Sequence, residues 1–385
     1  MKVLLSCLQA LQDHPIPAYS FWEVYFKKGL EEAGIEWVEV PGIDWAEGLA
    51  QTTTDGVKYW KEKAWSRTLD YLSPSQGNRV DLFLSYLFPE QIDPSAISEM
   101  KRLGIPCVNF FCDNLREFRK VPEPFHCFTL HWVPEYQALS MYQQAGYEHI
   151  HLPMPMWVPE DFRSVQVEEV FPPTFIGSRD IQREHLFAQV LSQLETPLLL
   201  RGRGWQKEEH HDTSPPKSFG TLLDNQLSYL KKDGLVPFVR KILDNWRKNI
   251  PSSAFDHAIG VAPQGERDYF NMIRQSEIAL GVNRFPSYRY PFTQPGTYSR
   301  LRDIEAPMLG ACYLTEWTEG LSDLYDLGVE IETYKNAEEM VSQIDKLVSH
   351  RKLRNSLRHA GQRRALAEHT IPMSMRKILK RLGLS

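Results

Sequence analysis

The chain has 385 residues, of which 42% are apolar and 12% aromatic, so it can bury sizeable cores and is not a disordered chain. At about 100–200 residues per domain, this length predicts two domains. The formal net charge of −5 provides no basic field for nucleic acid, so no nucleic-acid partner is expected.

The first residues, "MKVLLSCLQALQDHP", contain an apolar run that is too short for a secretory signal and that meets Gln, Asp and His at once. Nowhere do apolar residues approach the run of about 20 that a membrane-spanning helix needs, so no transmembrane segment is expected. The five cysteines are scattered and include no close-spaced pair of metal ligands. Reduced thiols, a cytoplasmic location and no metal site are therefore predicted.

The first part of the chain alternates between strand and helix signals. Nearly continuous apolar runs predict strands at 2–8, 35–42, 80–87, 105–114, 125–134 and 149–155. Amphipathic patterns predict helices at 20–34, 56–72, 94–104 and 135–146. Apolar strands that alternate with helices indicate a parallel sheet covered on both faces.

A stretch rich in proline and acidic residues, 154–173, is typical of a linker, and a second α/β series starts at "TFIGSR". This series is interrupted by an irregular stretch, about 206–257, which we interpret as a helical insertion. It resumes with a strand-helix-strand pattern at 258–283. The predicted fold class is therefore α/β, with two Rossmann-like doubly wound domains facing across a cleft. In such sheets ligands bind outside the carboxyl ends of strands, which makes the cleft the expected site.

Two turns in the second series have the composition of phosphate or nucleotide sites. Gly177, Ser178 and Arg179 follow a strand and precede a helix, where backbone N–H groups and a guanidinium suit a phosphate. A plain tight turn is the alternative. The sequence "RGRGW" follows the next strand. Its glycines allow the backbone to approach a ligand closely, and its Trp can pack against a nucleotide base. A surface turn with a packed Trp is the alternative there.

The segment "RDIEAPMLG" places a guanidinium and a carboxylate on one face of a short helix. Arg302, Glu305 and Leu309 share that face by their spacing, and Gly310 ends the helix. The carboxylate can accept hydrogen bonds from the two vicinal hydroxyls of a ribose. Without further context, a surface salt bridge between Arg302 and Glu305 is the alternative.

This segment and the sequence after it carry a family resemblance. The pattern "R-x-x-E-A-x-x-x-G-A", running into "YLTEWTEGLSDLYDLGVEIETY" and followed by "RNSLRHAGQRRALAEHT", resembles the C-terminal domain of GT-B fold glycosyltransferases. It is most similar to the spore-maturation-protein (CgeB-like) family of group 1. The resemblance covers about 174–384 without the insertion. It implies an acceptor domain at 1–160, a donor domain at 172–370 and a terminal helix, 371–385, that packs back on the acceptor domain.

The resemblance implies transfer of a sugar from a nucleotide-diphosphate sugar, with UDP favoured, and without a metal or another cofactor. The acceptor is unknown and can be a protein, a glycan or a small molecule; a homodimer is left open. The implied donor contacts lie by the diphosphate, the base and the ribose, and are Gly177, Ser178, Arg179, Arg201, Gly204, Trp205, Gln264, Arg302 and Glu305.

The chain departs from the family pattern at Thr297, where many retaining enzymes of this fold carry a second Glu. Retention and inversion therefore both stay open. The polar stretch around Thr297 offers Asn283, Arg284 and Tyr298 to line a sugar pocket, or it forms an ordered surface loop instead.

If the reaction inverts, the catalytic base would come from the first domain. His14 follows the first strand, and Asp113 ends another, in "CDN". Either residue can instead be structural or contact the acceptor. A nucleotide-sugar epimerase of the same fold and a non-catalytic nucleotide- or sugar-binding protein are the alternative functions.

Overall fold

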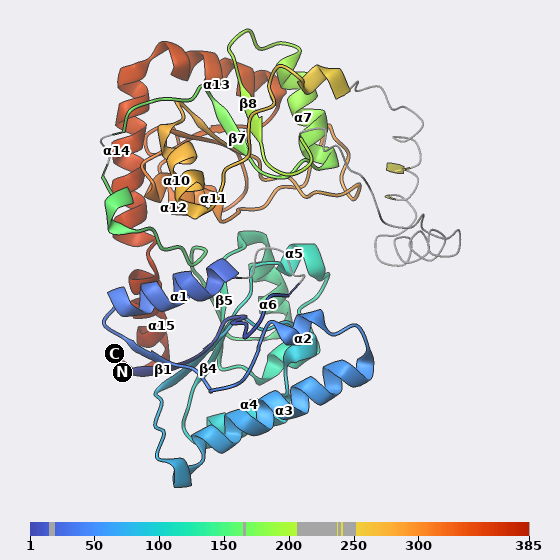
Figure 1. Ribbon diagram of the computed structural model, residues 1–385, viewed down its shortest axis with the longest axis vertical. Helices are drawn as coiled ribbons and strands as arrows, with labels where there is room; N and C mark the ends of the chain where they lie inside the picture. The colour runs from blue at the N-terminus through green and yellow to red at the C-terminus, as the bar shows by residue number, and fades with distance from the viewer. Residues whose placement is uncertain (15–19, 165–166, 206–236, 238–239, 242–251, 385) are drawn as a thin grey trace. The chain divides into compact units, whose positions relative to one another are not determined.

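The computed structural model describes residues 1–14, 20–164, 167–205, 237, 240–241 and 252–384 (Figure 1). The chain divides into two compact units, which are described separately. Unit 1 comprises Met1–Pro159 and Ala365–Ser385, and unit 2 comprises Glu160–Arg364. Most of the predicted insertion, 206–257, lies outside the described residues.

Unit 1 is built on a parallel sheet with the strand order β2-β1-β3-β4-β5-β6. The strands are β1 Lys2–Ser6, β2 Glu36–Val38, β3 Leu82–Ser85, β4 Cys107–Phe110, β5 Leu130–Val133 and β6 His149–His151. Each lies within a predicted apolar run. The run at 125–134 is only half strand, because its first residues belong to the 3-10 helix Glu123–Cys127. That helix contains Pro124, which lacks the N–H that a ladder needs.

Helices cover both faces of this sheet (Figure 1). On α1, Ser20–Glu32, Trp22 and Phe26 pack on Phe110, with ring centroids 5.2 and 5.7 Å apart. On α3, Thr54–Leu72, Trp65 packs on Phe83 at 6.1 Å. Phe83 is level with Cys107, an odd number of positions from Phe110, so the two phenyl rings point to opposite faces. Unit 1 therefore has three layers.

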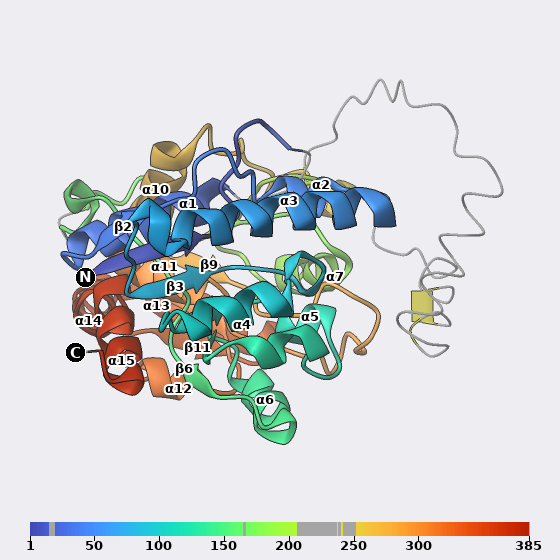
Figure 2. The same cartoon turned by 90° about the horizontal axis from the view of Figure 1, so that it is seen from below.

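The remaining helices of unit 1 complete these two layers. They are α2 Glu47–Ala50, α4 Pro94–Arg102, α5 Asn114–Glu117, α6 Leu139–Ala145 and α15 Ile371–Leu382. Helices α3 and α4 lie side by side (Figure 2). Helix α15, from the far end of the sequence, packs on α1, where a Cβ on Gly29 would come within 2.5 Å of the Ile371 side chain. A larger residue at position 29 would push the two helices apart.

Unit 2 has a second parallel sheet, in the order β11-β10-β9-β7-β8. Its strands are β7 Thr174–Ile176, β8 Leu199–Arg201, β9 Ala279–Gly281, β10 Tyr313–Glu316 and β11 Glu332–Tyr334. The strand predicted at the start of 258–283 is reduced to a single bridge between Leu200 and Ile259. One face of the sheet carries the main core, which includes Phe175, Leu280 and Leu314.

Among its described residues, unit 2 has the helices α7 Ile181–Leu191, α10 Glu266–Gln275, α11 Arg302–Met308, α12 Leu321–Leu324, α13 Ala337–Ser349 and α14 Arg351–Glu368, of which the last continues into unit 1. Helices α7 and α13 pack together over the core face, and α11 contacts β9 and β10. No helix in the part of the chain that the structure describes is both long and apolar enough to cross a membrane.

Candidate functional site

The strand order of unit 2 indicates where a ligand would bind. The chain passes from β7 to its neighbour β8 and then returns to β9 on the other side of β7. The boundary between β7 and β9 is thus a topological switch point, where open α/β sheets bind ligands at the carboxyl ends of strands. The segments that leave β7 and β9 supply the residues described next.

Helix α11 is fixed to the sheet by Asp303, which is fully buried. Its carboxylate accepts hydrogen bonds from Tyr313 Oη at 2.8 Å, Thr315 Oγ1 at 3.0 Å and Ser299 Oγ at 2.9 Å. Because Tyr313 and Thr315 belong to β10, this network sets the rotation of α11 on the sheet. That rotation decides where the neighbouring Arg302 points.

Glu305 of α11 is 3% exposed and has two polar neighbours. Tyr269 Oη of α10 donates to its Oε2 at 2.5 Å, and Arg302 Nε lies 3.0 Å from the same oxygen. The Arg302 guanidinium also lies over the Tyr269 ring, at 5.1 Å from its centroid. Burial raises the pKa of Glu305, although Arg302 and Tyr269 pull it down. The predicted pair of Arg302 and Glu305 therefore forms, but it is buried rather than on the surface.

Both of these contacts, among the residues that the structure describes, end on Oε2 of Glu305. We predicted that the two carboxylate oxygens of Glu305 bind two ribose hydroxyls. Tyr269 and Arg302 already contact Oε2, so they compete with a hydroxyl for that oxygen. Oε1 remains to accept a hydroxyl, and a carboxylate oxygen has lone pairs for two.

Two guanidinium groups contact β7, those of Arg302 and of Arg183, which lies 5.3 Å from the Phe175 ring centroid, and Arg300 is near enough to repel Arg183. Arg302 donates to the carbonyl of Ile176, the last residue of that strand, at 3.0 Å. Burial and repulsion by Arg300 and Arg302 lower the pKa of Arg183 to about 10, against the attraction of Asp180. Like charges held together in a partly buried place favour an anionic ligand, because an anion relieves their repulsion.

The turn Gly177–Arg179 differs from its prediction as a backbone phosphate cradle. The Gly177 and Arg179 N–H groups already donate to the carbonyls of Arg201 and Arg203, at 2.8 and 2.9 Å. The following helix is capped by Asp180, whose side chain accepts from two N–H groups of its first turn. Side chains rather than these amides are left to meet a phosphate, and Ser178 itself accepts from Arg183.

The predicted base-binding residues are mostly engaged within unit 2. Trp205 is 1% exposed, lies in the core and donates to the Gly177 carbonyl at 2.8 Å, which favours the packed-Trp alternative over a base wall. Arg201 is also buried and donates to the Val261 carbonyl at 2.7 Å. Gly204 packs on Arg179, where a Cβ would meet Arg179 Cβ at 3.3 Å. Gln264 is exposed, two residues before the start of α10.

The three predicted sugar-pocket residues are buried. Asn283 donates to the Glu316 carbonyl at 2.9 Å, and Arg284 Nε lies 2.7 Å from the Glu316 carboxylate. Tyr298 donates its backbone N–H to Asn283 and stacks under the Arg300 guanidinium, 4.5 Å from the ring centroid. The stretch is an ordered loop in which Asn283 and Arg284 belong to the internal polar network.

In unit 1, the structure gives His14 a carboxylate partner. His14 Nε2 lies 2.9 Å from Oδ2 of Asp44, and both side chains are 5% exposed. Asp44 is held by the Leu11 and Glu47 N–H groups, which donate to its two oxygens at 2.9 and 2.8 Å. A carboxylate fixed in this way orients an imidazole and stabilises its protonated form, which is what a general base needs.

The other predicted base, Asp113, lies at the end of β4 among further polar groups. Tyr86 Oη lies 3.4 Å from its Oδ2, and Arg116 is 3.8 Å away. The neighbouring Glu135 is fully buried and accepts from the Asn114 N–H at 2.7 Å. Burial raises the pKa of Glu135 to about 8, against the N–H groups that bond to it.

Sequence reasoning missed Tyr269, Asp44, Arg183 and Glu135. A signal existed for one of them, since Glu135 directly follows the strand predicted at 125–134. Nothing in the spacing links Tyr269 to Glu305 or Asp44 to His14. The described residues contain no group of three or more His, Cys, Asp or Glu side chains placed to hold a metal ion.

Comparison with known proteins identifies relatives of this architecture. Residues 235–380 match the model of a family described as glycosyl transferase-like, a stretch that includes Tyr269, Arg302 and Glu305. No curated protein matches the sequence.

The solved structures similar to this one include three whose chains are covered almost completely. Sucrose-phosphate synthase from Thermosynechococcus elongatus is 11% identical with a TM-score of 0.59, and each chain is covered to 99%. HepE of Anabaena, solved with UDP and glucose, is 12% identical with a TM-score of 0.56, covering 100% of this chain and 99% of that one. A glycosyltransferase from Rickettsia africae is 11% identical with a TM-score of 0.57, covering 98% and 97%.

At this identity the likeness shows the fold, and it confirms the predicted class of two doubly wound α/β domains of the GT-B type. The family match and this fold support the predicted enzyme class, a glycosyltransferase. The finer resemblance to the spore-maturation-protein family stays a prediction.

Proposed function

We propose that this protein is a metal-independent glycosyltransferase that moves a sugar from a nucleoside-diphosphate sugar, with UDP favoured, to an acceptor hydroxyl. The observation that carries the proposal is the pairing of buried Glu305 with Arg302, beside Arg183 and Arg300, at the switch point of unit 2. A carboxylate suits a ribose hydroxyl, and clustered guanidinium groups suit a diphosphate. HepE, which shares the fold, was solved with UDP-glucose, and this favours UDP as the carrier.

In this proposal unit 2 binds the donor. Glu305 accepts a ribose hydroxyl through Oε1, and Tyr269 holds the carboxylate in place through Oε2. The bond from the sugar's anomeric carbon to the diphosphate oxygen breaks, and that oxygen keeps the electron pair. Arg183, Arg300 and Arg302 offset the charge that develops there, a task that a divalent cation performs in other enzymes.

Unit 1 would supply the acceptor side of the reaction. The acceptor oxygen forms the new bond to the anomeric carbon, and its proton passes to His14. Asp44, at 2.9 Å, stabilises the resulting imidazolium. This route inverts the anomeric centre. A retaining route stays open. This chain has Thr297 where many retaining enzymes of the fold carry a Glu, and no other residue has been assigned the role of that Glu. Asp113 is the second candidate base.

The first test is a thermal-shift screen of the full chain against UDP, GDP, ADP, CMP and dTDP, because a ligand of the folded state raises the melting temperature. A shift with a nucleoside diphosphate is expected, and UDP should give the largest. No shift with any of the five would overturn the proposal.

The second test changes Glu305 to Gln and measures the affinity for the nucleotide by calorimetry. Gln keeps the size and an acceptor oxygen but removes the charge, so UDP should bind more weakly by about 1–3 kcal/mol. The matched control is Glu169→Gln, which also removes a buried charge from an arginine, since Glu169 Oε2 lies 2.6 Å from Arg354. Glu169 also pairs with Arg358, which bonds the Ser276 carbonyl just before β9, at the amino end of the strands rather than their carboxyl end. Equal UDP affinity in both variants would remove Glu305 from the site.

A further inference from the structure

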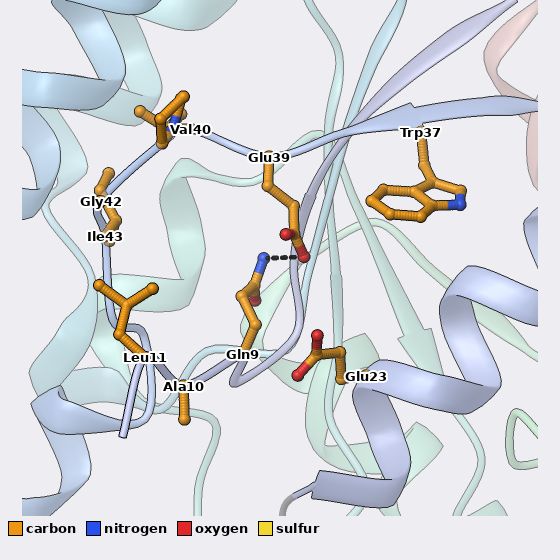
Figure 3. Close-up of a pocket in the computed structure, with 10 residues that line it drawn as sticks. Gln9, Ala10, Leu11, Glu23, Trp37, Glu39, Val40, Gly42 and Ile43 are labelled. Carbon is orange, nitrogen blue, oxygen red and sulfur yellow. Dashed lines mark hydrogen bonds between the residues drawn. The ribbon is translucent and has the colours of Figure 1, made fainter. Parts of the chain in front are cut away.

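A cavity of about 490 Å³ lies in unit 1 where the chain leaves β1 and β2 (Figure 3). Binding sites for small molecules span about 300–1,000 Å³, so this volume suits one such ligand. The lining residues on one side are mostly apolar or backbone, from 10–11 and 40–43. The other side is polar and contains Gln9, Glu23 and Glu39, whose side chains point toward one another in Figure 3.

Gln9 is a fixed part of this polar side. It is 6% exposed, and its Nε2 donates to Glu39 Oε1 at 3.0 Å and to the Leu5 carbonyl at 2.9 Å. Its Oε1 accepts from the Cys7 N–H at 2.6 Å. The amide therefore holds the Glu39 carboxylate in one orientation. The Glu23 and Glu39 side chains are 30% and 28% exposed, so a ligand can reach both carboxylates.

The charge of this side is negative. Lys27 Nζ lies 2.5 Å from Glu23 and 2.9 Å from Glu39, so one ammonium group offsets two carboxylates. Burial opposes the charge of Lys27, but its bonds to the two carboxylates outweigh burial and raise its pKa. Lys27 also lies 4.7 Å from the ring centroid of Trp37, which lines the cavity. The Lys27 ammonium group thus contacts the Trp37 ring and both carboxylates at once.

We propose that this cavity binds a polyol without negative charge, a neutral or amino-substituted sugar or cyclitol, as the acceptor of the transfer. The proposal rests on the glycosyltransferase function proposed above. Hydroxyl and ammonium groups donate to Glu23 and Glu39, whereas a carboxylate or phosphate on the ligand would meet like charge. The C–H face of a sugar ring packs against Trp37 and the aliphatic residues on the other side.

The same two segments connect the cavity with the proposed base. Leu11, a lining residue, donates its N–H to Asp44 at 2.9 Å, and Ile43, another lining residue, directly precedes Asp44. Asp44 in turn holds His14. A ligand seated between these segments is therefore bound by the chain that positions the imidazole.

The test measures binding of single sugars to the full chain by ligand-observed NMR, with no nucleotide present. The probes are methyl β-glucoside, glucosamine and glucuronic acid, which are similar in size and differ in charge. The first two should bind, and glucuronic acid should bind about tenfold more weakly or not at all because of charge repulsion. No binding of the first two at millimolar concentration, or equal binding of glucuronic acid, would overturn the proposal.

Glu39→Gln should weaken glucosamine binding and remove the discrimination against glucuronic acid. The matched control is Glu36→Gln on the same strand, where Glu36 is 60% exposed and pairs with Lys2. It should change neither result, and an effect as large as that of Glu39→Gln would place the ligand elsewhere. Because no nucleotide is present, the two proposals fail separately. UDP binding without sugar binding would refute the acceptor cavity. Sugar binding without UDP binding would refute the glycosyltransferase function.

Discussion

Glu135 gives the sharpest prediction about ionisation in the fold. Its pKa is raised from 4.5 to about 8 by burial, so the folded state prefers the neutral acid. A carboxyl with a raised pKa contributes its stability fully below the unfolded value, and that contribution is lost as pH rises through about 8. The change of roughly 3.5 pKa units, at 1.36 kcal/mol each, corresponds to at most about 5 kcal/mol.

The variant Glu135→Gln isolates this effect, because Gln keeps the shape and stays neutral at every pH. It retains an acceptor oxygen for the Asn114 N–H, which now donates to Glu135 Oε2 at 2.7 Å. The unfolding free energy of the variant minus that of the wild type should rise between about pH 4.5 and 8 and then level off. Other titrating groups are common to both proteins and cancel in the difference.

Urea unfolding at a series of pH values, followed by tryptophan fluorescence, measures this difference. Glu99→Gln serves as the control, since Glu99 is on the surface of α4 beside Arg102 and should give a flat difference. A difference for Glu135→Gln that is flat, or that falls as pH rises, would show that Glu135 is ionised across the range and refute the argument.

Two further predictions concern unit 2. Gly202 has a φ of 119°, and a Cβ there would come within 2.7 Å of the Gly177 carbonyl oxygen. Gly202→Ala should therefore cost about 1–3 kcal/mol in urea unfolding, and a neutral result would contradict the close approach of the two turns. Arg284→Met should cost about 3–5 kcal/mol because it leaves the buried Glu316 carboxylate without its cation, whereas the double change with Glu316→Leu should recover most of this. Equal losses in the single and double variants would contradict the ion pair's role.

The fold could be predicted because buried parallel strands leave an unbroken apolar run between polar turns. Every strand of the unit 1 sheet lies within such a run. The errors have local causes. At 125–134 the apolar residues are those of a 3-10 helix that packs Phe125 and Cys127 inward. At 258–261 the chain pairs with β8 only through a single bridge between Ile259 and Leu200, so this apolar run does not form a strand.

The site could be predicted only where it depends on spacing along one helix. Arg302 and Glu305 are three positions apart, and their pairing follows from helical geometry. The partner of Glu305 on α10, Tyr269, and the partner of His14, Asp44, are 36 and 30 positions away. Such partners are set by which strand ends meet at one edge of a sheet, and no local pattern records that.

The burial of Asn283 and Arg284 shows the opposite limit of sequence reasoning. A stretch rich in Asn, Arg and Tyr suggests a ligand pocket, yet the same groups satisfy buried carboxylates, here Glu316 and Asp303. Composition cannot distinguish the two, because a buried acid needs the same donors as a bound anion.

The chemistry of the two units is complementary at the level of charge. Unit 2 has guanidinium groups at its switch point, and burial together with the neighbouring arginines lowers the pKa of Arg183 to about 10. Unit 1 instead has Glu23 and Glu39 in its cavity and Asp44 on His14. If both proposals hold, the first set suits a nucleoside diphosphate and the second suits an uncharged polyol. Each unit would then bind its own class of substrate, and the charge of each set would disfavour a ligand of the same sign.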